Sequence, residues 1–334
     1  MVHPESIPRL RSLELDNIRN FKNLKLDFGD AAASSSGPLR RHQTTLVIGR
    51  NGTNKSTLLR ALALALANET DASAMLATEM GSLVGERGDR ARIRVELATR
   101  DGLEFELVRE LRRDGGIDTL VGSHGQSAEE MGLFVCGYGA GRGVTGTDSG
   151  RDYRVFDATG SLFDYRRELL SPELVLRRLA DSLGEPRFGA ALVQIARAIG
   201  LEGENPRIEF AKGGGVAITA DGVGRQIPLE GLADGFRVMF SWIIDAYGRT
   251  LKRNWLCEDG SVGGLILIDE IDQHLHPQLQ QSRPSDPPGA DGADADGTTR
   301  RSPPGDRSPA QRVTAVIHVA RERDDEHGQK RSSN

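Results

Sequence analysis

The segment TTLVIGRNGTNKSTLLRALALAL at residues 44–66 decides the fold, because it reads as a strand, a turn and a helix in direct succession. Residues 44–49 form a short apolar run, which is typical of a strand buried in a sheet. Residues 55–68 follow a helical pattern that is apolar almost all round, which predicts a helix buried against that sheet. Further strands and helices alternate along the chain, and this alternation predicts a layered α/β fold.

The turn between this strand and this helix, GRNGTNKST at residues 49–57, matches the phosphate-binding pattern G-x-x-x-x-G-K-[S/T] at every fixed position but one. In such a loop, backbone N–H groups at the start of the helix bind anions. Lys55 can reach the β- and γ-phosphates, and the Ser56 hydroxyl can ligate Mg²⁺. The residues predicted to bind the nucleotide are Gly49, Arg50, Asn51, Gly52, Thr53, Asn54, Lys55, Ser56 and Thr57. The alternative is a glycine-rich turn that caps a core helix.

The one departure from the pattern is Asn54, which stands where glycine is usual. Glycine is favoured there because the loop needs an unusual backbone conformation and a close approach to phosphate. Asparagine tolerates the left-handed conformation better than most residues, at a cost of about 1–2 kcal/mol. We therefore expect phosphate binding to be weakened rather than abolished.

A second segment, GLILIDEID at residues 264–272, places two acids directly after a short apolar strand. In open α/β sheets, ligands bind at the carboxyl ends of the strands. Asp269 is therefore predicted to hold Mg²⁺, and Glu270 to polarise the attacking water. The alternative is an ordinary buried strand that ends in solvated acids.

A third segment, LADGFR at residues 232–237, precedes an apolar helix. A small loop that opens a helix offers a second N-terminus favourable to anions. The alternative is a plain helix N-cap in which Asp234 is the capping residue. Taken by itself, this segment favours the cap.

Taken in this order, the three segments resemble the ATP-binding heads of ABC-type ATPases in the SMC, RecF and OLD-like group, and in particular its compact bacterial "AAA family ATPase" members. The resemblance extends from residue 8 to about residue 280. The further segments that carry it are NIRNFKNLKLDF at 17–28, CGYGAGR at 136–142, PLEGLADGFRVMFSWIIDAY at 228–247 and LILIDEIDQHLHPQLQ at 265–280.

This resemblance implies a P-loop NTPase fold of the ABC-ATPase head type, with a mixed sheet, flanking helices and an antiparallel β lobe. It also implies a homodimer in which two heads enclose two ATP molecules. Lys55 and Glu270 would be catalytic, and Ser56 and Asp269 would hold Mg²⁺. Each head would contact the γ-phosphate on its partner through Leu232, Ala233, Asp234 and Gly235. The hairpin at Asn20, Phe21 and Lys22 would approach the nucleotide, with a solvated turn as the alternative.

Three further departures from the family pattern bear on hydrolysis. Ala233 stands where the family has a serine, so the hydroxyl that contacts the γ-phosphate is missing. The switch histidine expected on the strand after Glu270 is not in place, and His318 in VTAVIHVA is the candidate for its role. No clear glutamine follows the phosphate loop in the family's position, which leaves Gln126 or Arg142 as substitutes.

Composition and charge exclude several other classes of protein. The 334 residues carry a net charge of −5, so no global basic surface indicates nucleic-acid binding. The chain lacks an apolar run of the ~20 residues that span a bilayer and an apolar leader at its start. Its two cysteines, Cys136 and Cys257, cannot build a disulfide framework. We therefore expect a cytoplasmic protein.

Residues 1–280 are predicted to form the head, with a small helical insertion at about 161–205. Residues 281–334 are rich in proline, glycine and aspartate, so we expect no packed core there. This tail is consistent with a native disordered segment, with an insert before a last strand at 313–320, or with a shifted reading frame. In the last two cases the sheet edge after Glu270 would be poorly covered.

Three functions remain open. The first is an ATPase in DNA repair or phage defence, which acts on DNA or with a separate nuclease or effector protein. The second is a nucleotide-binding dimerisation switch with little hydrolysis that regulates a partner effector. The third is an inactive copy. The region between residues 57 and 232 is too poor in helical sequence for a long coiled-coil arm, so tethering of DNA through such an arm is excluded.

Overall fold

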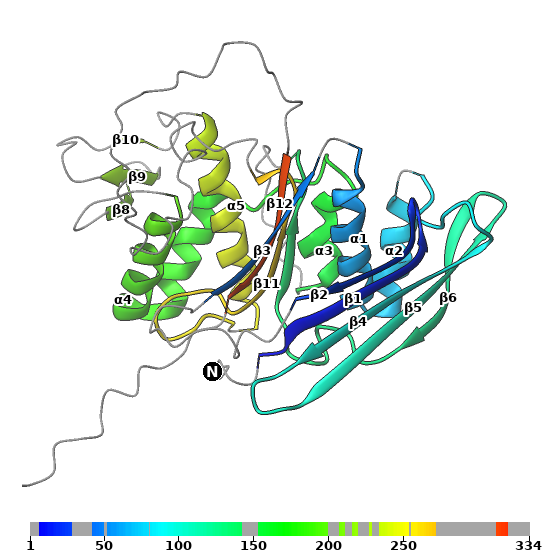
Figure 1. Ribbon diagram of the computed structural model, residues 1–334. Helices are drawn as coiled ribbons and strands as arrows, with labels where there is room; N and C mark the ends of the chain where they lie inside the picture. Colours follow the sequence, from blue (N-terminus) through cyan, green and yellow to red (C-terminus); the bar gives the residue numbers. More distant parts are fainter. Residues whose placement is uncertain are drawn as a thin grey trace, which may run out of the picture.

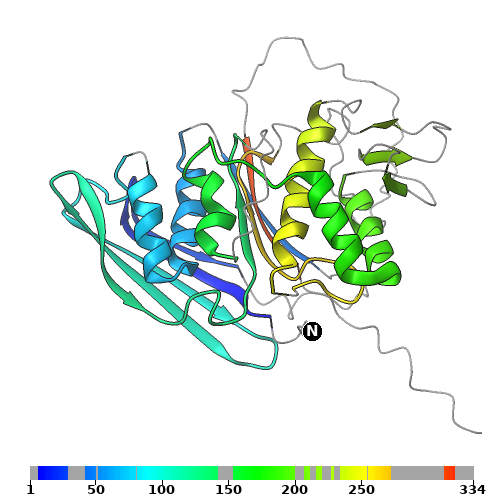
Figure 2. The same ribbon diagram turned by 180° about the vertical axis from the view of Figure 1, so that it is seen from behind.

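The computed structural model describes residues 7–28, 42–49, 52–79, 81–141, 153–199, 207–210, 216–219, 227–228, 234–253, 255–271 and 312–319. Within these residues the strands form three sheets, and the helices pack between and beside the two larger ones (Figures 1 and 2). The mixed α/β architecture, with an antiparallel β lobe, agrees with the fold expected from the sequence.

The β lobe is a five-stranded antiparallel sheet. Its strands are β1 (Arg9–Ile18), β2 (Phe21–Asp27), β4 (Arg90–Ala98), β5 (Glu104–Asp114) and β6 (Ile117–His124), in the order β2-β1-β4-β5-β6. Side chains alternate across β1, so that Leu13 and Leu15 are fully buried while Glu14 faces outward, opposite Lys25. Because β-strand side chains alternate with a period of two, this pattern buries one face of the sheet and leaves the other polar.

The second sheet has four strands in the order β3-β12-β11-β7. These are β3 (His42–Gly49), β12 (Arg312–Val319), β11 (Gly264–Ile268) and β7 (Val135–Tyr138). Strand β12 pairs antiparallel with both β3 and β11, so β3 and β11 run in the same direction. Strand β7 pairs parallel with β11. The carboxyl ends of β3, β11 and β7 therefore meet at one edge of this sheet.

The helices cover the sheets from two sides. α1 (Lys55–Leu66) and α2 (Glu69–Thr78) lie on the buried face of the β lobe, and α3 (Val155–Thr159) continues into a short 3-10 turn, η2 (Gly160–Leu162). Figure 1 shows α5 (Asp234–Thr250) and α4 (Pro172–Ala198) on the other side of the four-stranded sheet. α4 is interrupted at Gly184 (φ 69°, ψ 164°), two residues before Pro186, so it comprises two helical segments, within the helical insertion expected at about 161–205.

Several elements were not predicted from the sequence. They are α2, α3, strand β6 and strand β10 (Ile227–Pro228). Strand β10 belongs to a small antiparallel sheet with β9 (Val216–Thr219) and β8 (Arg207–Phe210), in the order β10-β9-β8. Residues 312–319, which belong to the tail, lie within the four-stranded sheet. This strand therefore belongs to the sheet that carries the phosphate loop. Among the helices that the structure describes, none combines the length and the apolar character needed to cross a bilayer.

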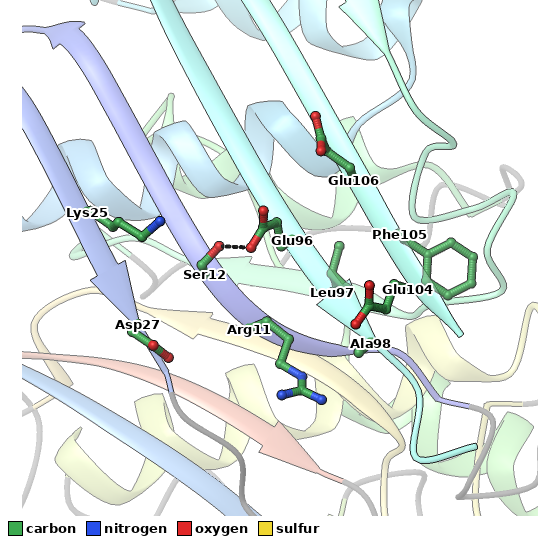
Figure 3. A pocket seen from close by; sticks show the side chains of 10 residues that line it. All are labelled: Arg11, Ser12, Lys25, Asp27, Glu96, Leu97, Ala98, Glu104, Phe105 and Glu106. Atoms are coloured by element: carbon green, nitrogen blue, oxygen red, sulfur yellow. Dashed lines mark hydrogen bonds between the residues drawn. The ribbon is translucent and has the colours of Figure 1, made fainter. Parts of the chain in front are cut away.

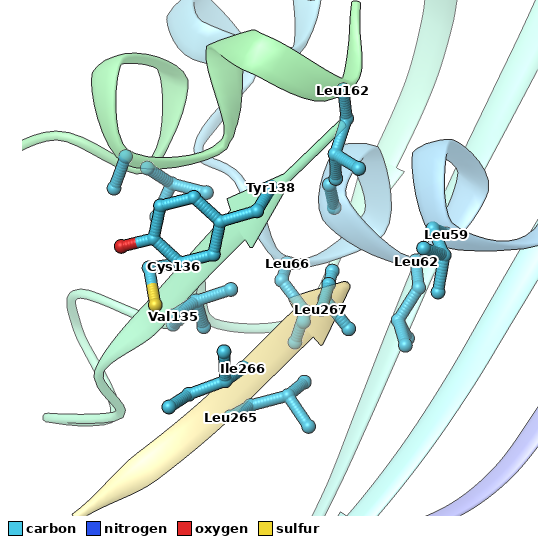
Figure 4. Close-up of a cluster of buried hydrophobic side chains, with 14 of the residues drawn as sticks. Leu59, Leu62, Leu66, Val135, Cys136, Tyr138, Leu162, Leu265, Ile266 and Leu267 are labelled. Atoms are coloured by element: carbon cyan, nitrogen blue, oxygen red, sulfur yellow. The ribbon is translucent and has the colours of Figure 1, made fainter. Parts of the chain in front are cut away.

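The core is centred on α1, which is apolar almost all round because it is enclosed by both sheets. Its Leu59, Leu62 and Leu66 are fully buried, and they belong to the same cluster of buried hydrophobic side chains as Leu265 and Leu267 of β11 (Figure 4). Burying one leucine side chain contributes about 1.5–3 kcal/mol, so this cluster stabilises the core that contains both α1 and β11.

The outer edge of the four-stranded sheet is less well covered. Leu46 and Ile48 of β3 are 50% and 59% exposed, respectively. Strand β3 is an edge strand, and its neighbour β12 comes from the compositionally unusual tail. This edge is not the one after Glu270 that the sequence expectation concerned, because β11 pairs with β12 on one side and with β7 on the other.

The carboxyl end of α1 is stabilised by a buried arginine. Arg109 on β5 is 1% exposed and donates hydrogen bonds to the carbonyl oxygens of Ala67 (2.7 Å), His124 (2.9 Å) and Val108 (3.0 Å). Burial lowers the pKa of Arg109. Because the last carbonyl groups of a helix carry partial negative charge, the guanidinium compensates the end of α1.

We predict that Arg109→Leu lowers the free energy of unfolding by about 2–4 kcal/mol, because it leaves buried carbonyl groups without donors. The control is Arg112→Leu, which removes a half-exposed partner of Asp89 and is expected to cost less than about 1 kcal/mol. Urea denaturation followed by circular dichroism measures both changes. Equal effects of the two substitutions would contradict the role assigned to Arg109.

Candidate functional site

The predicted phosphate loop ends in a left-handed residue. Asn54, the N-cap residue of α1, adopts φ 61° and ψ 26°, and Gly52 also has a positive φ of 80°. This is the backbone geometry that favours glycine in such loops, and asparagine tolerates it at a modest cost. The side chain of Asn54 makes no capping hydrogen bond, and the first turn of α1 contains no acidic residue. The amide groups and positive dipole end of α1 are therefore suited to an anionic ligand.

The loop and the predicted acidic strand end are in direct contact. The Ser56 hydroxyl donates a hydrogen bond to Oδ2 of Asp269 at 2.5 Å, although the two residues are 213 positions apart. Asp269 is 6% exposed, and its backbone N–H donates to the carbonyl oxygen of Tyr138 at 2.8 Å. Lys55 is buried beside Ser56, at 9% exposure. The fold thus brings together the lysine, the hydroxyl and the carboxylate that the sequence predicts for one site.

The donor set fits Mg²⁺. A serine hydroxyl and an aspartate carboxylate are hard oxygen ligands, and here they already lie within hydrogen-bond distance. Among the described residues, no group of three or more histidine, cysteine or acidic side chains could hold a metal ion. Mg²⁺ is usually bound by one or two protein oxygens, with phosphates and water as further ligands, and so needs no such cage.

Glu270 follows Asp269 in a strained backbone conformation. Its φ is 48°, which is unfavourable for a residue with a side chain of this length. Strain of this kind is often found at functional sites, where surrounding structure holds it in place. The left-handed residue turns the chain sharply at the end of β11, next to the carboxylate that contacts the loop.

The structure adds a residue that we did not single out from the sequence. Arg19, in the turn between β1 and β2, donates from Nη1 to the Thr57 hydroxyl at 3.0 Å. From the sequence we expect Asn20, Phe21 and Lys22 of this hairpin to approach the nucleotide, and of these Asn20 and Lys22 are exposed. The sequence does place an arginine in this turn, within NIRNFKN, but it does not show which residue of the turn points inward.

Strand β12 does not bring His318 to this site. His318 pairs with Leu265 of β11 and Gln43 of β3, whereas Asp269 follows the opposite end of β11. The reason is the direction of β12: because it is antiparallel to its neighbours, its first residues, not its last, lie at the edge where the loop begins. This placement corrects the expectation that His318 serves as the switch histidine at the nucleotide.

Other predicted residues are placed only in part. Gly49 ends β3, and Asp234 and Gly235 begin α5. Arg50, Asn51, Leu232 and Ala233 lie outside the described residues, as does Arg142. Gln126 is exposed in the turn after β6.

A buried network connects this strand edge to α5. Asp245 of α5 is fully buried and accepts hydrogen bonds from the Tyr138 hydroxyl (2.8 Å), the Leu170 N–H (2.8 Å) and Nε of Arg249 (2.7 Å). Burial, together with the neighbouring charge of Asp245, raises the pKa of Tyr138 well above its usual range, so the phenol remains protonated and donates. The carbonyl oxygen of Tyr138 also accepts a hydrogen bond from the Asp269 N–H. This tyrosine therefore links the acidic strand end to α5, the helix that begins at Asp234.

A hollow lies on the outer face of the β lobe, away from α1 (Figure 3). It is lined by both acidic and basic side chains, and Ser12 donates a hydrogen bond to Glu96 at 2.7 Å within it. The charged side chains of this face form exposed ion pairs such as Lys25–Glu14. Exposed pairs contribute little to stability, and this hollow shares no residue with the phosphate loop.

Comparison with known proteins gives matches to one group of ATPases. Residues 12–131 match a family model described as an AAA domain. The chain is 23% identical over 278 residues to Septu protein PtuA of Bacillus mycoides (strain KBAB4), which covers 80% of this chain and 35% of that protein. It is 32% identical over 111 residues to the DNA double-strand break repair Rad50 ATPase of Aeropyrum pernix, which covers 33% of this chain and 10% of that protein.

The chain therefore spans only part of the length of these relatives. Among solved structures, it is similar to the recombination mediator protein RecF with ATP, at 13% identity and a TM-score of 0.37, over 84% of this chain and 90% of that one.

We predict that Asp245→Asn lowers the free energy of unfolding by about 3–5 kcal/mol, because it leaves Arg249 as an uncompensated charge that is largely buried. Tyr138→Phe is the matched control: it removes one hydrogen bond and is expected to cost about 0.5–1.5 kcal/mol. Chemical denaturation of both variants measures the difference. If Asp245→Asn costs no more than Tyr138→Phe, the charge of Asp245 does not hold α5 in place.

Proposed function

We propose that this chain carries an ATPase head of the SMC/RecF-like ABC type, and that it binds ATP with Mg²⁺ and hydrolyses it. The observation that carries the proposal is the hydrogen bond between Ser56 and Asp269, which joins the phosphate loop to the acidic strand end. A glycine-rich turn that merely capped a core helix would not need a buried carboxylate against its serine.

In this proposal each residue has a distinct role. The amide groups of residues 52–57 and the Lys55 ammonium bind the phosphates at the N-terminus of α1. Ser56 and Asp269 hold Mg²⁺, which when bound neutralises charge on the phosphates. Glu270 accepts a proton from a water molecule as that water attacks the γ-phosphorus. The bond from the γ-phosphorus to the bridging oxygen breaks, and ADP leaves with inorganic phosphate.

We further propose that the head works as a homodimer, in which residues 232–235 of one copy contact the nucleotide held by the other. The position of α5 supports this proposal, because the helix begins at Asp234 and is held to β7 by the buried Asp245. Hydrolysis would then open the dimer that ATP closes. DNA, or a separate nuclease or effector protein, is the proposed partner, in DNA repair or phage defence. The names of the relatives support this context, since one is a DNA double-strand break repair ATPase.

A dimerisation switch with little hydrolysis is the second candidate. Two observations favour this candidate. His318 lies at the opposite end of β11 from Asp269, and Ala233 stands where the family has a serine. In that case ATP occupancy itself, rather than turnover, would signal to an effector. We propose a cytoplasmic location for either function, which is supported by the two buried cysteines, Cys136 and Cys257, because neither takes part in a disulfide within the described residues.

The proposal is tested by measuring ATP affinity and turnover for the wild type, Lys55→Ala and Glu270→Gln. Lys55→Ala is expected to bind ATP at least about tenfold more weakly, because it removes a charge-assisted contact to phosphate. Glu270→Gln is expected to keep ATP affinity and to lose turnover by about 10²–10⁴-fold, because it removes the general base. Glu104→Gln, on the outer face of the β lobe, is the matched control and should behave as wild type.

The outcomes separate the candidates. Wild-type turnover that both variants lose supports the ATPase. Tight binding without turnover in any version, together with an ATP-dependent doubling of molar mass in light scattering, supports the switch. Failure of the wild type to bind ATP would contradict both and favour the inactive copy.

A further inference from the structure

The turn between β1 and β2, which carries Arg19, is held in place by backbone hydrogen bonds to residues 83–85. The Arg19 N–H donates to the carbonyl oxygen of Leu83, and the Gly85 N–H donates to that of Asn17, both at 2.7 Å. A Cβ atom on Gly85 would lie 2.6 Å from the carbonyl oxygen of Arg19, so only glycine allows this approach. Arg19 itself has a φ of 47°. The surrounding structure therefore holds this left-handed turn in a single position.

The guanidinium of Arg19 is fixed at each of its nitrogens. Nε donates to the carbonyl oxygen of Ser82 (3.2 Å), Nη2 to Oε1 of Glu79 (2.7 Å) and Nη1 to the Thr57 hydroxyl (3.0 Å). The Glu79 side chain is 2% exposed and also accepts from Arg60 of α1 at 2.9 Å. Burial raises the pKa of Glu79, and the two arginines oppose that shift. Glu79 thus anchors Arg19 beside the first turn of α1.

Thr57 is left with an unused donor. It is 1% exposed, and its hydroxyl oxygen accepts from Arg19. A guanidinium has donors only, so the Thr57 hydroxyl cannot donate in return. Within the part of the chain that the structure describes, no acceptor takes its proton. A buried hydroxyl donor without an acceptor is unfavourable, and here it lies in the third residue of the helix that begins at the phosphate loop.

We infer that Arg19 is a positioning residue that orients the Thr57 hydroxyl as a hydrogen-bond donor to a nucleotide phosphate. By occupying the acceptor side of the hydroxyl, the guanidinium turns the proton away from itself, and a phosphate oxygen supplies the missing acceptor. The inference rests on the proposed ATP site and assigns to the first hairpin a part in building it. Arg19 acts through Thr57 and needs no contact with the nucleotide.

A double-mutant cycle on ATP binding tests this coupling. Arg19→Met and Thr57→Val are each expected to raise the Kd for Mg·ATP about tenfold, and the double variant is expected to raise it about tenfold as well, because both changes remove the same hydrogen bond. Isothermal titration calorimetry on the full chain gives all four Kd values. Thr57→Ser, which keeps the hydroxyl, should restore most of the affinity that Thr57→Val loses. Arg112→Met, which removes an exposed arginine, is the control and should bind like the wild type.

The inference is overturned if the two changes multiply to about a hundredfold loss, which means that Arg19 and Thr57 act independently. It is equally overturned if Arg19→Met leaves Kd unchanged. If Arg19→Met does not fold, as judged by thermal denaturation, Arg19→Lys takes its place, because it keeps a positive charge beside Glu79 but lacks the planar fork that spans both partners.

The two proposals can fail separately. A wild-type protein that does not bind Mg·ATP contradicts the proposed function and with it the inference. A wild-type protein that binds, a Lys55→Ala variant that does not, and an Arg19–Thr57 cycle without coupling contradict the inference alone.

Discussion

The hydrogen bond between Ser56 and Asp269 is the contact on which the site depends. It can form only because β3 and β11 lie in one sheet, run in the same direction and end at the same edge. The buried leucines of α1 belong to the same core as β11, and Arg109 compensates the far end of that helix. The anion-binding end of α1 is thereby kept beside the only carboxylate that the loop serine contacts among the described residues.

Around this contact, three parts of the chain are connected to the first turn of α1 or to the sheet edge beside it. The first hairpin reaches Thr57 through Arg19, the acidic strand reaches Ser56 through Asp269, and α5 is tied to the same edge through Tyr138 and Asp245. Each connection uses a buried charge or a buried polar group, and such groups are costly unless their partners are in place. These partnered groups therefore hold the site in one shape when no ligand is bound. A ligand that brings further hydrogen-bond acceptors and negative charge can change that shape.

Much of this arrangement could be predicted from the sequence where the local pattern is strong. The alternation in residues 10–28 gives the β1–β2 hairpin, and the apolar run before Asp269 gives β11. The left-handed conformation at Asn54 follows from the loop pattern alone. The short helices α2 and α3 and strand β6 were missed because their patterns are weak and their positions depend on tertiary packing. Arg19 was missed because its role depends on Gly85 and Glu79, which are far away in the sequence. The direction of β12, which removes His318 from the site, is set by pairing, and no residue pattern reports it.

The most direct test of the account is whether Mg²⁺ strengthens ATP binding through Asp269. Titration calorimetry of the wild type and of Asp269→Asn, each with and without Mg²⁺, separates this effect from general loss of affinity. The control is Asp259→Asn, at a half-buried aspartate whose carboxylate accepts hydrogen bonds from Ser261. We expect Mg²⁺ to tighten ATP binding by the wild type and by Asp259→Asn, and to have little effect on Asp269→Asn. An equal effect of Mg²⁺ on all three proteins would show that the loop and the acidic strand end do not form one site.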